Sequence, residues 1–226
     1  MPILAIDTAS RWTAIALLDE QKDKIIAEKG WVATLRQTVE LAPSIDEMLQ
    51  NAALRPADLS GISVAIGPGS YTGLRIGMGL ARGLALVHKL PIAAIRTHDI
   101  VAQNVPQSPQ KLLVGVEAGR KRVLIAPYVW SQEKKQGWDR AGEIDNPTWP
   151  ELLESIHEPV LLAGEVPSEI AEQIQSNADL SKMIELAAAE YSVRSAAILA
   201  RLGHQQISSG SLPDQDLLVP QYLRHP

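Results

Sequence analysis

Gly67-Pro68-Gly69-Ser70-Tyr71-Thr72-Gly73-Leu74-Arg75-Ile76-Gly77 lies between an apolar run and an apolar-periodic stretch. The run, residues 62–66, predicts a buried strand, and the stretch, residues 72–89, predicts a helix. A glycine turn between a strand and a helix often binds phosphate, because glycines let the backbone approach a ligand and a helix N-terminus offers free amides. This order of elements favours an α/β fold.

The glycine spacing excludes two common nucleotide-binding fingerprints. A Walker loop requires Lys and then Ser or Thr directly after its last glycine, whereas Leu74-Arg75 follow Gly73. The dinucleotide fingerprint would require a third glycine where Thr72 stands. The segment therefore binds another ligand or serves packing. Its candidate phosphate contacts are Gly67, Gly69 and Ser70.

The composition indicates a globular chain without thiol chemistry. Its 226 residues include no Cys and no Phe, and the net charge is −5. The first 106 residues carry 10 basic and 10 acidic side chains, so the acidic excess lies in the rest of the chain. The sequence has no dominant basic face of the kind that indicates direct nucleic-acid binding. We find no signal-peptide pattern and no apolar segment of membrane length, and therefore expect a soluble, cytoplasmic protein.

Two predicted hairpins repeat at an offset of 110 positions. Residues 3–6 and 13–18 read as strands around a short turn, and residues 113–116 and 123–126 align with them without a gap. Each hairpin has an acidic residue at the end of its first strand, Asp7 or Glu117. This favours an internal duplication over a chance match of short apolar strands.

The remaining pattern alternates strands with helices and favours two subdomains with mixed sheets. In the first part we expect further strands at 25–32, 62–66 and 91–95 and helices at 38–53, 72–89 and 98–104. In the second we expect a loop at 131–147, a helix from 149, a strand at 159–163, and helices at 167–176 and 190–206. The Pro- and Gln-containing residues 104–110 predict a linker, which divides the chain into subdomains 1–106 and 107–226.

The predicted helix at 72–89 contains four glycines. These are Gly73, Gly77, Gly79 and Gly83. Each costs roughly 1 kcal/mol relative to Ala within a helix, so close packing must offset the loss. Gly73 and Gly77 share one face and allow another backbone to approach, while Arg75 and Arg82 share another face. The partner across Gly73 and Gly77 is either the protein's own sheet or a helix of another chain.

The predicted helix at 38–53 carries an amphipathic stripe. Its apolar members are Val39, Ala42, Ile45, Met48, Leu49 and Ala52. Such a stripe is typical of a core-facing helix. A role as an interface would require a second apolar face, for which Leu41 is the candidate.

The remaining polar groups suggest little catalytic chemistry. Asp7, at a predicted strand end, either orients a metal-bound phosphate or is an exposed turn residue. No two of the five His residues have helical metal-ligand spacing, and Ser70 has no neighbouring base that would make it a nucleophile. The basic turn Arg120-Lys121-Arg122 is either a solvated hairpin tip or a contact for a phosphate backbone.

Three motifs together resemble the bacterial TsaB family. They are the glycine segment 67–77, Ile6-Asp7-Thr8-Ala9 near the start, and Pro220-Gln221-Tyr222-Leu223-Arg224 near the end. The resemblance implies an actin-like ATPase (ASKHA, ribonuclease H-like) fold of two duplicated subdomains. It also implies the role of a dimerisation subunit in the complex that makes threonylcarbamoyladenosine in tRNA.

The resemblance implies partners that perform the chemistry. These are a catalytic paralogue, TsaD, and a small P-loop ATPase, TsaE, which would hold the ATP and metal that this chain lacks. TsaD binds its metal through paired histidines on its first helix, and this chain has none there. Active actin-like ATPases also place a glycine after their first aspartate, whereas Thr8 follows Asp7 here. Both differences indicate a pseudo-enzyme.

The chain departs from the family pattern at three places. Tyr71 replaces a common Phe, Arg36-Gln37-Thr38 replaces a His-Ser pair, and Glu117-Ala118-Gly119-Arg120 replaces an Asp-Ala-Arg-like turn. The second departure puts in doubt a role for that pair, although not the helix that follows it.

We therefore expect a non-catalytic scaffold whose helices 38–53 and 72–89 form a bundle with the same helices of TsaD or of a second copy. The expected interface residues are Val39, Leu41, Ile45, Met48, Gly73, Leu74, Arg75, Gly77, Met78 and Arg82. The complex would modify N6 of the adenosine beside the anticodon, with tRNA bound only through the complex. The possible tRNA contacts in this chain are Arg120, Lys121 and Arg122. The alternatives are a peptidase-like or ATP-hydrolysing enzyme and a free-standing nucleotide sensor.

Overall fold

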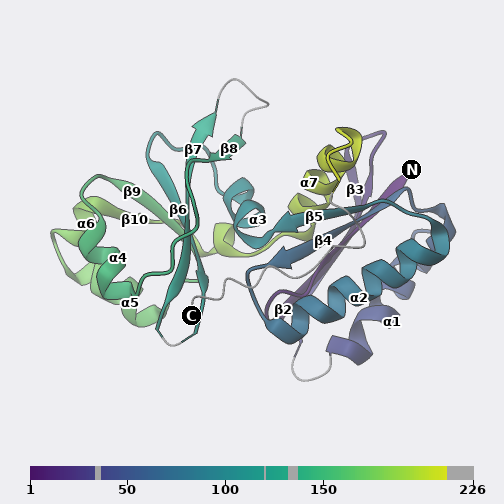
Figure 1. The fold of residues 1–226 in the computed structure, drawn as a ribbon, viewed down its shortest axis with the longest axis horizontal. Coiled ribbons are helices and arrows are strands. Elements are labelled where there is room, and N and C mark those ends of the chain that lie inside the picture. Colours follow the sequence, from purple (N-terminus) through teal and green to yellow (C-terminus); the bar gives the residue numbers. More distant parts are fainter. Residues whose placement is uncertain (34–36, 120, 132–136, 213–226) are drawn as a thin grey trace. The chain divides into compact units, whose positions relative to one another are not determined.

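The computed structural model describes residues 1–33, 37–119, 121–131 and 137–212, which form two compact units (Figure 1). The first unit contains Met1–Ile100 and the described residues from Arg194 onward, and the second contains Val101–Val193. The family-like motif at 220–224 and Arg36 lie outside the described residues. Among the described helices, none combines the length and apolar character needed to cross a membrane.

The first unit is a five-stranded mixed sheet in the order β3-β2-β1-β4-β5. Its strands are β1 (Pro2–Asp7), β2 (Trp12–Asp19), β3 (Lys24–Val32), β4 (Gly61–Gly67) and β5 (Ile92–Arg96). β1 pairs antiparallel with β2 and parallel with β4. β1 and β4 are buried along their whole length, which explains why their sequences are nearly continuous apolar runs.

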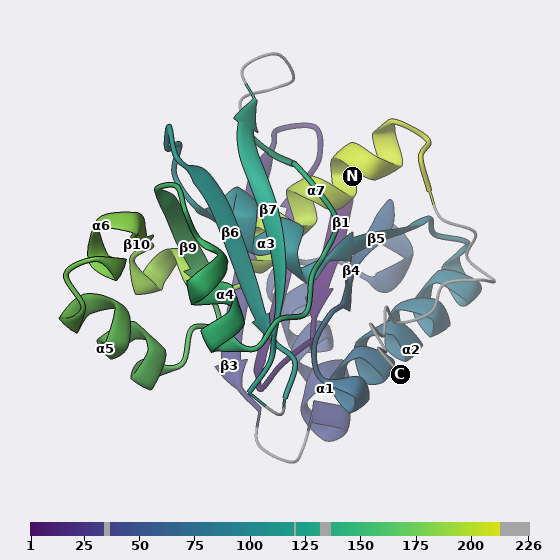
Figure 2. The same cartoon turned by 60° about the vertical axis from the view of Figure 1, so that its left-hand side comes forward.

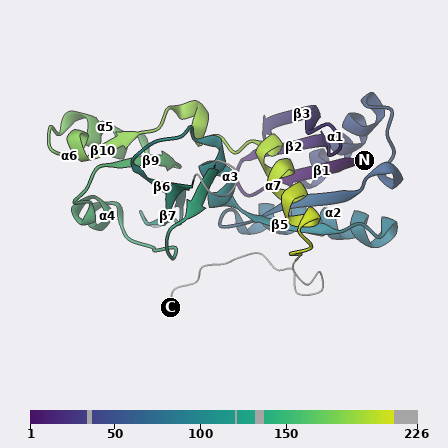
Figure 3. The ribbon, with the colours of Figure 1, turned by 90° about the horizontal axis from the view of Figure 1, so that it is seen from above.

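Helices cover both faces of this sheet. They are α1 (Gln37–Asn51), the short η1 (Pro56–Asp58), α2 (Tyr71–His88), α3 (Thr97–Asn104), which continues into the second unit, and α7 (Ala196–Ser208). Alternate residues of β1 point to opposite faces: Leu4 joins the core that includes α1 and α2, while Ala5 joins the core that includes Leu199 of α7. Figure 3 shows α7 lying across the strands.

The last helix differs from its predicted position and domain. It begins at Ala196 rather than residue 190, because Ser195 caps it by accepting a hydrogen bond from the Ile198 amide at 3.3 Å. It packs on the first sheet, where Ser63 Oγ donates to the Leu199 carbonyl at 2.8 Å. The predicted subdomains 1–106 and 107–226 therefore do not coincide with the two compact units. The helix packs closely against the first sheet because small side chains of the helix lie at that contact.

The second unit repeats the same topology. Its strands are β6 (Lys111–Glu117), β7 (Val123–Ser131), β8 (Gly137–Arg140), β9 (Val160–Gly164) and β10 (Ile184–Leu186), in the order β10-β9-β6-β7-β8. β6 is antiparallel to β7 and parallel to β9, as β1 is to β2 and β4. Two mixed sheets of one design confirm the predicted fold class and account for the repeated hairpins.

Helices also flank the second sheet. They are α4 (Trp149–Ser155), α5 (Ser168–Ser176), α6 (Leu180–Met183) and the short η2 (Ala189–Ser192). Figure 2 shows α5 and α6 beside β9 and β10, where Ile170 and Ile174 are buried. The predicted loop at 131–147 contains β8, because Trp138 is buried and its indole Nε1 donates to the Val105 carbonyl at 2.9 Å.

Candidate functional site

Asp7 is the last residue of β1. It lies at the carboxyl ends of the parallel strands, where β4 and β5 also end. Its side chain is fully buried, and its Oδ1 accepts a hydrogen bond from the Ala9 amide at 2.8 Å. Its Oδ2 lies 3.2 Å from Nε of Arg194, which is also buried. The interpretation of Asp7 as an exposed turn residue is therefore wrong. Arg194, which precedes the cap of α7, was not identified from the sequence.

The turn after β1, residues 8–11, holds the start of α2. Thr8 Oγ1 donates to the Gly73 carbonyl at 2.7 Å, and the Ser70 amide donates to the Ala9 carbonyl at 2.6 Å. A Cβ atom added to Gly73 would collide with the Thr8 carbonyl, and one added to Gly77 would collide with Thr8 Oγ1. Gly73 and Gly77 therefore allow α2 to pack on its own sheet, which was the first of the two alternatives.

The residues of the glycine turn before α2 make close contacts with other parts of the chain. Gly67 has φ 106°, a left-handed conformation that favours glycine, and a Cβ on Gly69 would collide with the Ala9 carbonyl. Ser70 caps α2, because its Oγ accepts from the Gly73 amide at 3.2 Å. A hollow of about 430 Å³ beside it is lined by polar groups that include Ser10, Arg11, Thr38 and Thr72. Phosphate binding by Gly67, Gly69 and Ser70 remains a prediction.

The described residues offer little for metal chemistry. Within the described parts of the chain, no three His, Asp or Glu side chains come together in a way that could hold a metal ion. The buried polar residues Ser63, Thr97 and His98 all lie on or directly after strands of the first sheet. Neither Thr97 nor His98 was identified from the sequence as a buried polar residue.

The side of α2 away from the sheet presents a second pair of glycines. We call this side the outer face of α2 and define it by Arg75, Gly79, Arg82, Gly83 and Leu86, all of which are exposed. A Cβ added to Gly79 or Gly83 would meet no atom within 4 Å. Leu86 is 84% exposed and its neighbour Val87 is 73% exposed. The guanidinium carbon of Arg75 lies 4.0 Å from the centroid of the Tyr71 ring.

The predicted interface residues divide into buried and exposed groups. Buried in the core of the first unit are Leu41, Ile45, Met48, Leu74 and Met78, together with Gly73 and Gly77, which lie against Thr8. Val39, Arg75 and Arg82 are exposed. The seven buried residues do not present a surface to a partner, because the sheet already covers their side of each helix. The apolar stripe of α1 is therefore a core stripe, and Leu41 belongs to the core as well.

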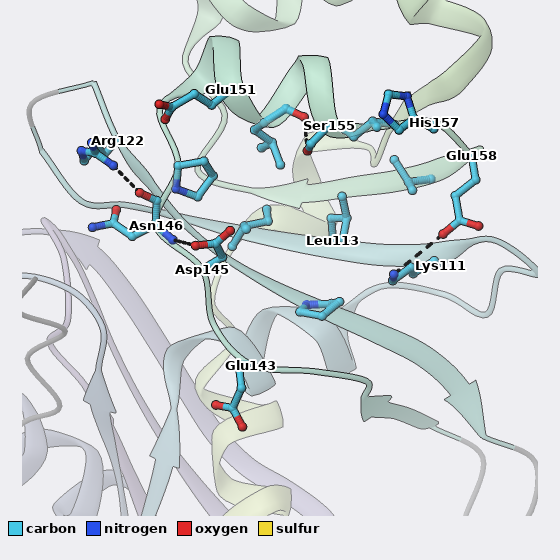
Figure 4. Close-up of a pocket in the computed structure, with 16 residues that line it drawn as sticks. Lys111, Leu113, Arg122, Glu143, Asp145, Asn146, Glu151, Ser155, His157 and Glu158 are labelled. Carbon is cyan, nitrogen blue, oxygen red and sulfur yellow. Dashed lines mark hydrogen bonds and ion pairs between the residues drawn. The ribbon is translucent and has the colours of Figure 1, made fainter.

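The basic turn of the second unit borders a groove of about 570 Å³ on the face of its sheet (Figure 4). Arg120 lies outside the described residues, and Lys121 is exposed. Arg122 Nη1 donates to the Asn146 carbonyl at 2.5 Å. Acidic side chains of the groove outnumber its Lys and Arg side chains. The acidic residues are Glu143, Asp145, Glu151 and Glu158.

One of these carboxylates has a shifted pKa. Hydrogen bonds from the Thr148 amide and hydroxyl, in a capping box at the start of α4, lower the pKa of Glu151, and the charge of Arg122 adds to this effect. A groove in which carboxylates outnumber basic side chains disfavours a phosphate backbone. A tRNA contact through Lys121 and Arg122 is left as a prediction, and this groove does not add to it.

Comparisons with known proteins give one consistent result. A family model described as "TsaD: tRNA N6-adenosine threonylcarbamoyltransferase" matches residues 31–226. The tRNA threonylcarbamoyladenosine biosynthesis protein TsaB of Bacillus subtilis is 33% identical over 224 residues, which cover 99% of this chain and 94% of that protein.

Two solved structures support the fold alone. YeaZ from Pseudomonas aeruginosa superposes with a TM-score of 0.75 at 20% identity, covering 98% of this chain and all of that chain (100%). A ROK hexokinase from Thermus thermophilus superposes with a TM-score of 0.52 at 11% identity, covering 93% of this chain and 100% of that chain. These similarities confirm the actin-like ATPase fold. The chain therefore belongs to the family described by the TsaD model and, within it, to the TsaB proteins of tRNA threonylcarbamoyladenosine biosynthesis.

Proposed function

We propose that this chain is a non-catalytic scaffold subunit that binds a TsaD-type catalytic paralogue through the outer face of α2. The observation that carries the proposal is the pair Gly79 and Gly83, which lie on an exposed helix face with open space above them. Each glycine costs about 1 kcal/mol relative to Ala in a helix interior, and no contact within the described chain offsets that loss. Close approach of a partner's backbone would offset it.

The neighbouring side chains support an interface at this face. Leu86 and Val87 expose apolar surface at the C-terminal end of α2. Arg75 and Arg82 supply the guanidinium groups that are common at the centres of protein interfaces. The partner's equivalent helix would cross at the two glycines, with Leu86 as an apolar anchor. A second copy of this chain would fit the same face when TsaD is absent.

We propose the remaining partners from the family assignment. The complex would transfer a threonylcarbamoyl group to N6 of the tRNA adenosine beside the anticodon, in the cytoplasm. A TsaE-type P-loop ATPase would join this complex, and ATP and a metal would be bound by the partner subunits. This chain would bind tRNA only as part of the complex, with Lys121 and Arg122 as candidate contacts.

Reconstitution with a purified TsaD-type subunit tests the proposal. We expect static light scattering to show a 1:1 complex, and tRNA modification to require both chains. Turnover of ATP or tRNA by this chain alone would favour the enzyme alternatives. A TsaD-type subunit that neither binds this chain nor gains activity from it would contradict the scaffold role.

A further inference from the structure

The end of β1 is the place where this fold would position a carboxylate for a ligand. β1, β4 and β5 are parallel, and in open α/β sheets ligands bind outside the carboxyl ends of such strands. An actin-like ATPase fold therefore implies a metal-bound nucleotide close to Asp7. The residues present do not fit that group, because the carboxylate already has a cation beside it.

That cation is the guanidinium of Arg194. Its Nε lies 3.2 Å from Asp7 Oδ2, while Asp7 Oδ1 accepts the Ala9 amide at 2.8 Å. The side chains of Asp7 and Arg194 are 1% and 5% exposed, so bulk water does not screen the pair. A buried carboxylate requires a countercharge, and a guanidinium supplies one together with N–H donors.

Hydrogen bonds at the start of α7 hold the backbone next to Arg194 in place. Ser195, the next residue, caps α7 and donates its hydroxyl to Glu28 Oε1 at 3.0 Å. The Ala197 amide donates to the same carboxylate oxygen at 3.0 Å. The start of α7 is therefore bound to β3 on one side and to Asp7 at the end of β1 on the other.

We infer that Arg194 is the resident cation of the Asp7 site and that it takes the place a metal ion would occupy in a nucleotide-binding relative. Both carboxylate oxygens of Asp7 already have a positively charged or N–H neighbour. The β1 end is thus closed by the chain itself, and Asp7 organises the turn that holds α2 instead of binding a metal-bound phosphate. This inference concerns the first unit alone and stands whether or not the outer face of α2 binds TsaD.

Cation rescue tests this inference. We would compare the wild type, Arg194→Ala and the double variant Asp7→Asn/Arg194→Ala by thermal unfolding, with and without millimolar guanidinium chloride. We expect guanidinium to raise the unfolding temperature of Arg194→Ala by several degrees and to leave the other two unchanged. Arg201→Ala is the matched control, because Arg201 forms an exposed ion pair with Asp23. An Arg194→Ala variant that loses no more stability than this control would overturn the proposal.

Manganese binding provides the second measurement. Electron paramagnetic resonance with Mn²⁺ and ADP should detect no binding site that depends on Asp7. Any signal from bound Mn²⁺ should therefore be the same in the wild type and in Asp7→Asn. Detection of such a site would overturn the proposal, because Arg194 would then not occupy it.

A third comparison applies if Arg194→Ala does not fold. Arg194→Met should be strongly destabilised, and Asp7→Asn/Arg194→Met should recover most of the lost stability, because the second change removes the uncompensated charge. A double variant as unstable as the single one would attribute the loss to packing and reject the inference.

Discussion

The two glycine pairs of α2 have the same spacing but opposite surroundings. Gly73 and Gly77 lie against Thr8, directly after β1, and any side chain there would collide with this residue. Gly79 and Gly83 lie on the outer face of α2 and have no atom within reach of an added Cβ. The first pair therefore explains how the helix packs on its own sheet. The second pair has no such explanation within the described chain and is the basis of the proposed interface.

The largest effect should come from Gly73→Ala. The new methyl group would meet the Thr8 carbonyl, which belongs to the backbone and cannot move without displacing β1. We expect a loss of about 3 kcal/mol or more in the free energy of unfolding. Urea denaturation measures it, and a loss below about 1 kcal/mol would show that α2 can shift away from the sheet.

Gly77→Ala should cost less and should depend on Thr8. Its methyl group would meet Thr8 Oγ1, a side-chain atom. We expect a loss of about 2 kcal/mol, and less than that when Thr8→Ala is already present, because Ala lacks the hydroxyl group. A double-mutant cycle measures this coupling. The same cycle with Gly73→Ala is the control and should show no comparable relief, because Thr8→Ala keeps the carbonyl.

Gly79→Ala and Gly83→Ala should change stability in the opposite direction. Both sites are exposed and open, so each substitution should raise the free energy of unfolding by about 1 kcal/mol through helix propensity. Denaturation of the purified chain under conditions that keep it monomeric measures the gain. A loss of stability would mean that these positions pack against the chain itself and would remove the distinction between the two pairs.

Ser70→Ala should have the smallest effect. Its hydroxyl caps α2, and loss of an N-cap usually costs roughly 1 kcal/mol. Because the contacts of Thr8 and Ala9 also hold the start of α2, we expect the free energy of unfolding to fall by less than roughly 1 kcal/mol. A loss as large as that of Gly73→Ala would mean that the cap, rather than the packed pair, positions this helix.

Most of the fold could be predicted from local patterns. The apolar runs that became β1 and β4 are buried strands, and the run in β6 is mostly buried. The offset of 110 residues between hairpins matches two sheets of identical topology. The position of α7 could not be predicted this way. Its packing on the first sheet depends on contacts such as Ser63 with Leu199, which are far apart in the sequence.

The candidate site was less predictable than the fold. The pairing of Asp7 with Arg194 joins distant residues and has no sequence pattern that identifies it. The distinction between the glycine pairs did have a signal. Leu74, Met78, Ala81 and Ala85 mark the buried side of α2, and a helical projection places Gly77 near that side and Gly79 opposite to it. Glycine spacing alone does not show this difference, because the members of both pairs are four residues apart.

The affinity of Gly79→Ala/Gly83→Ala for the TsaD-type subunit tests the central claim most directly. Gln173→Ala, on the exposed side of α5 in the second unit, is the control for a surface substitution to Ala. Isothermal titration calorimetry should show at least about tenfold weaker binding for the double variant, equivalent to about 1.4 kcal/mol, although its unfolding temperature is higher than that of the wild type. Unchanged affinity in a stabilised variant would contradict the account and place the partner on another surface.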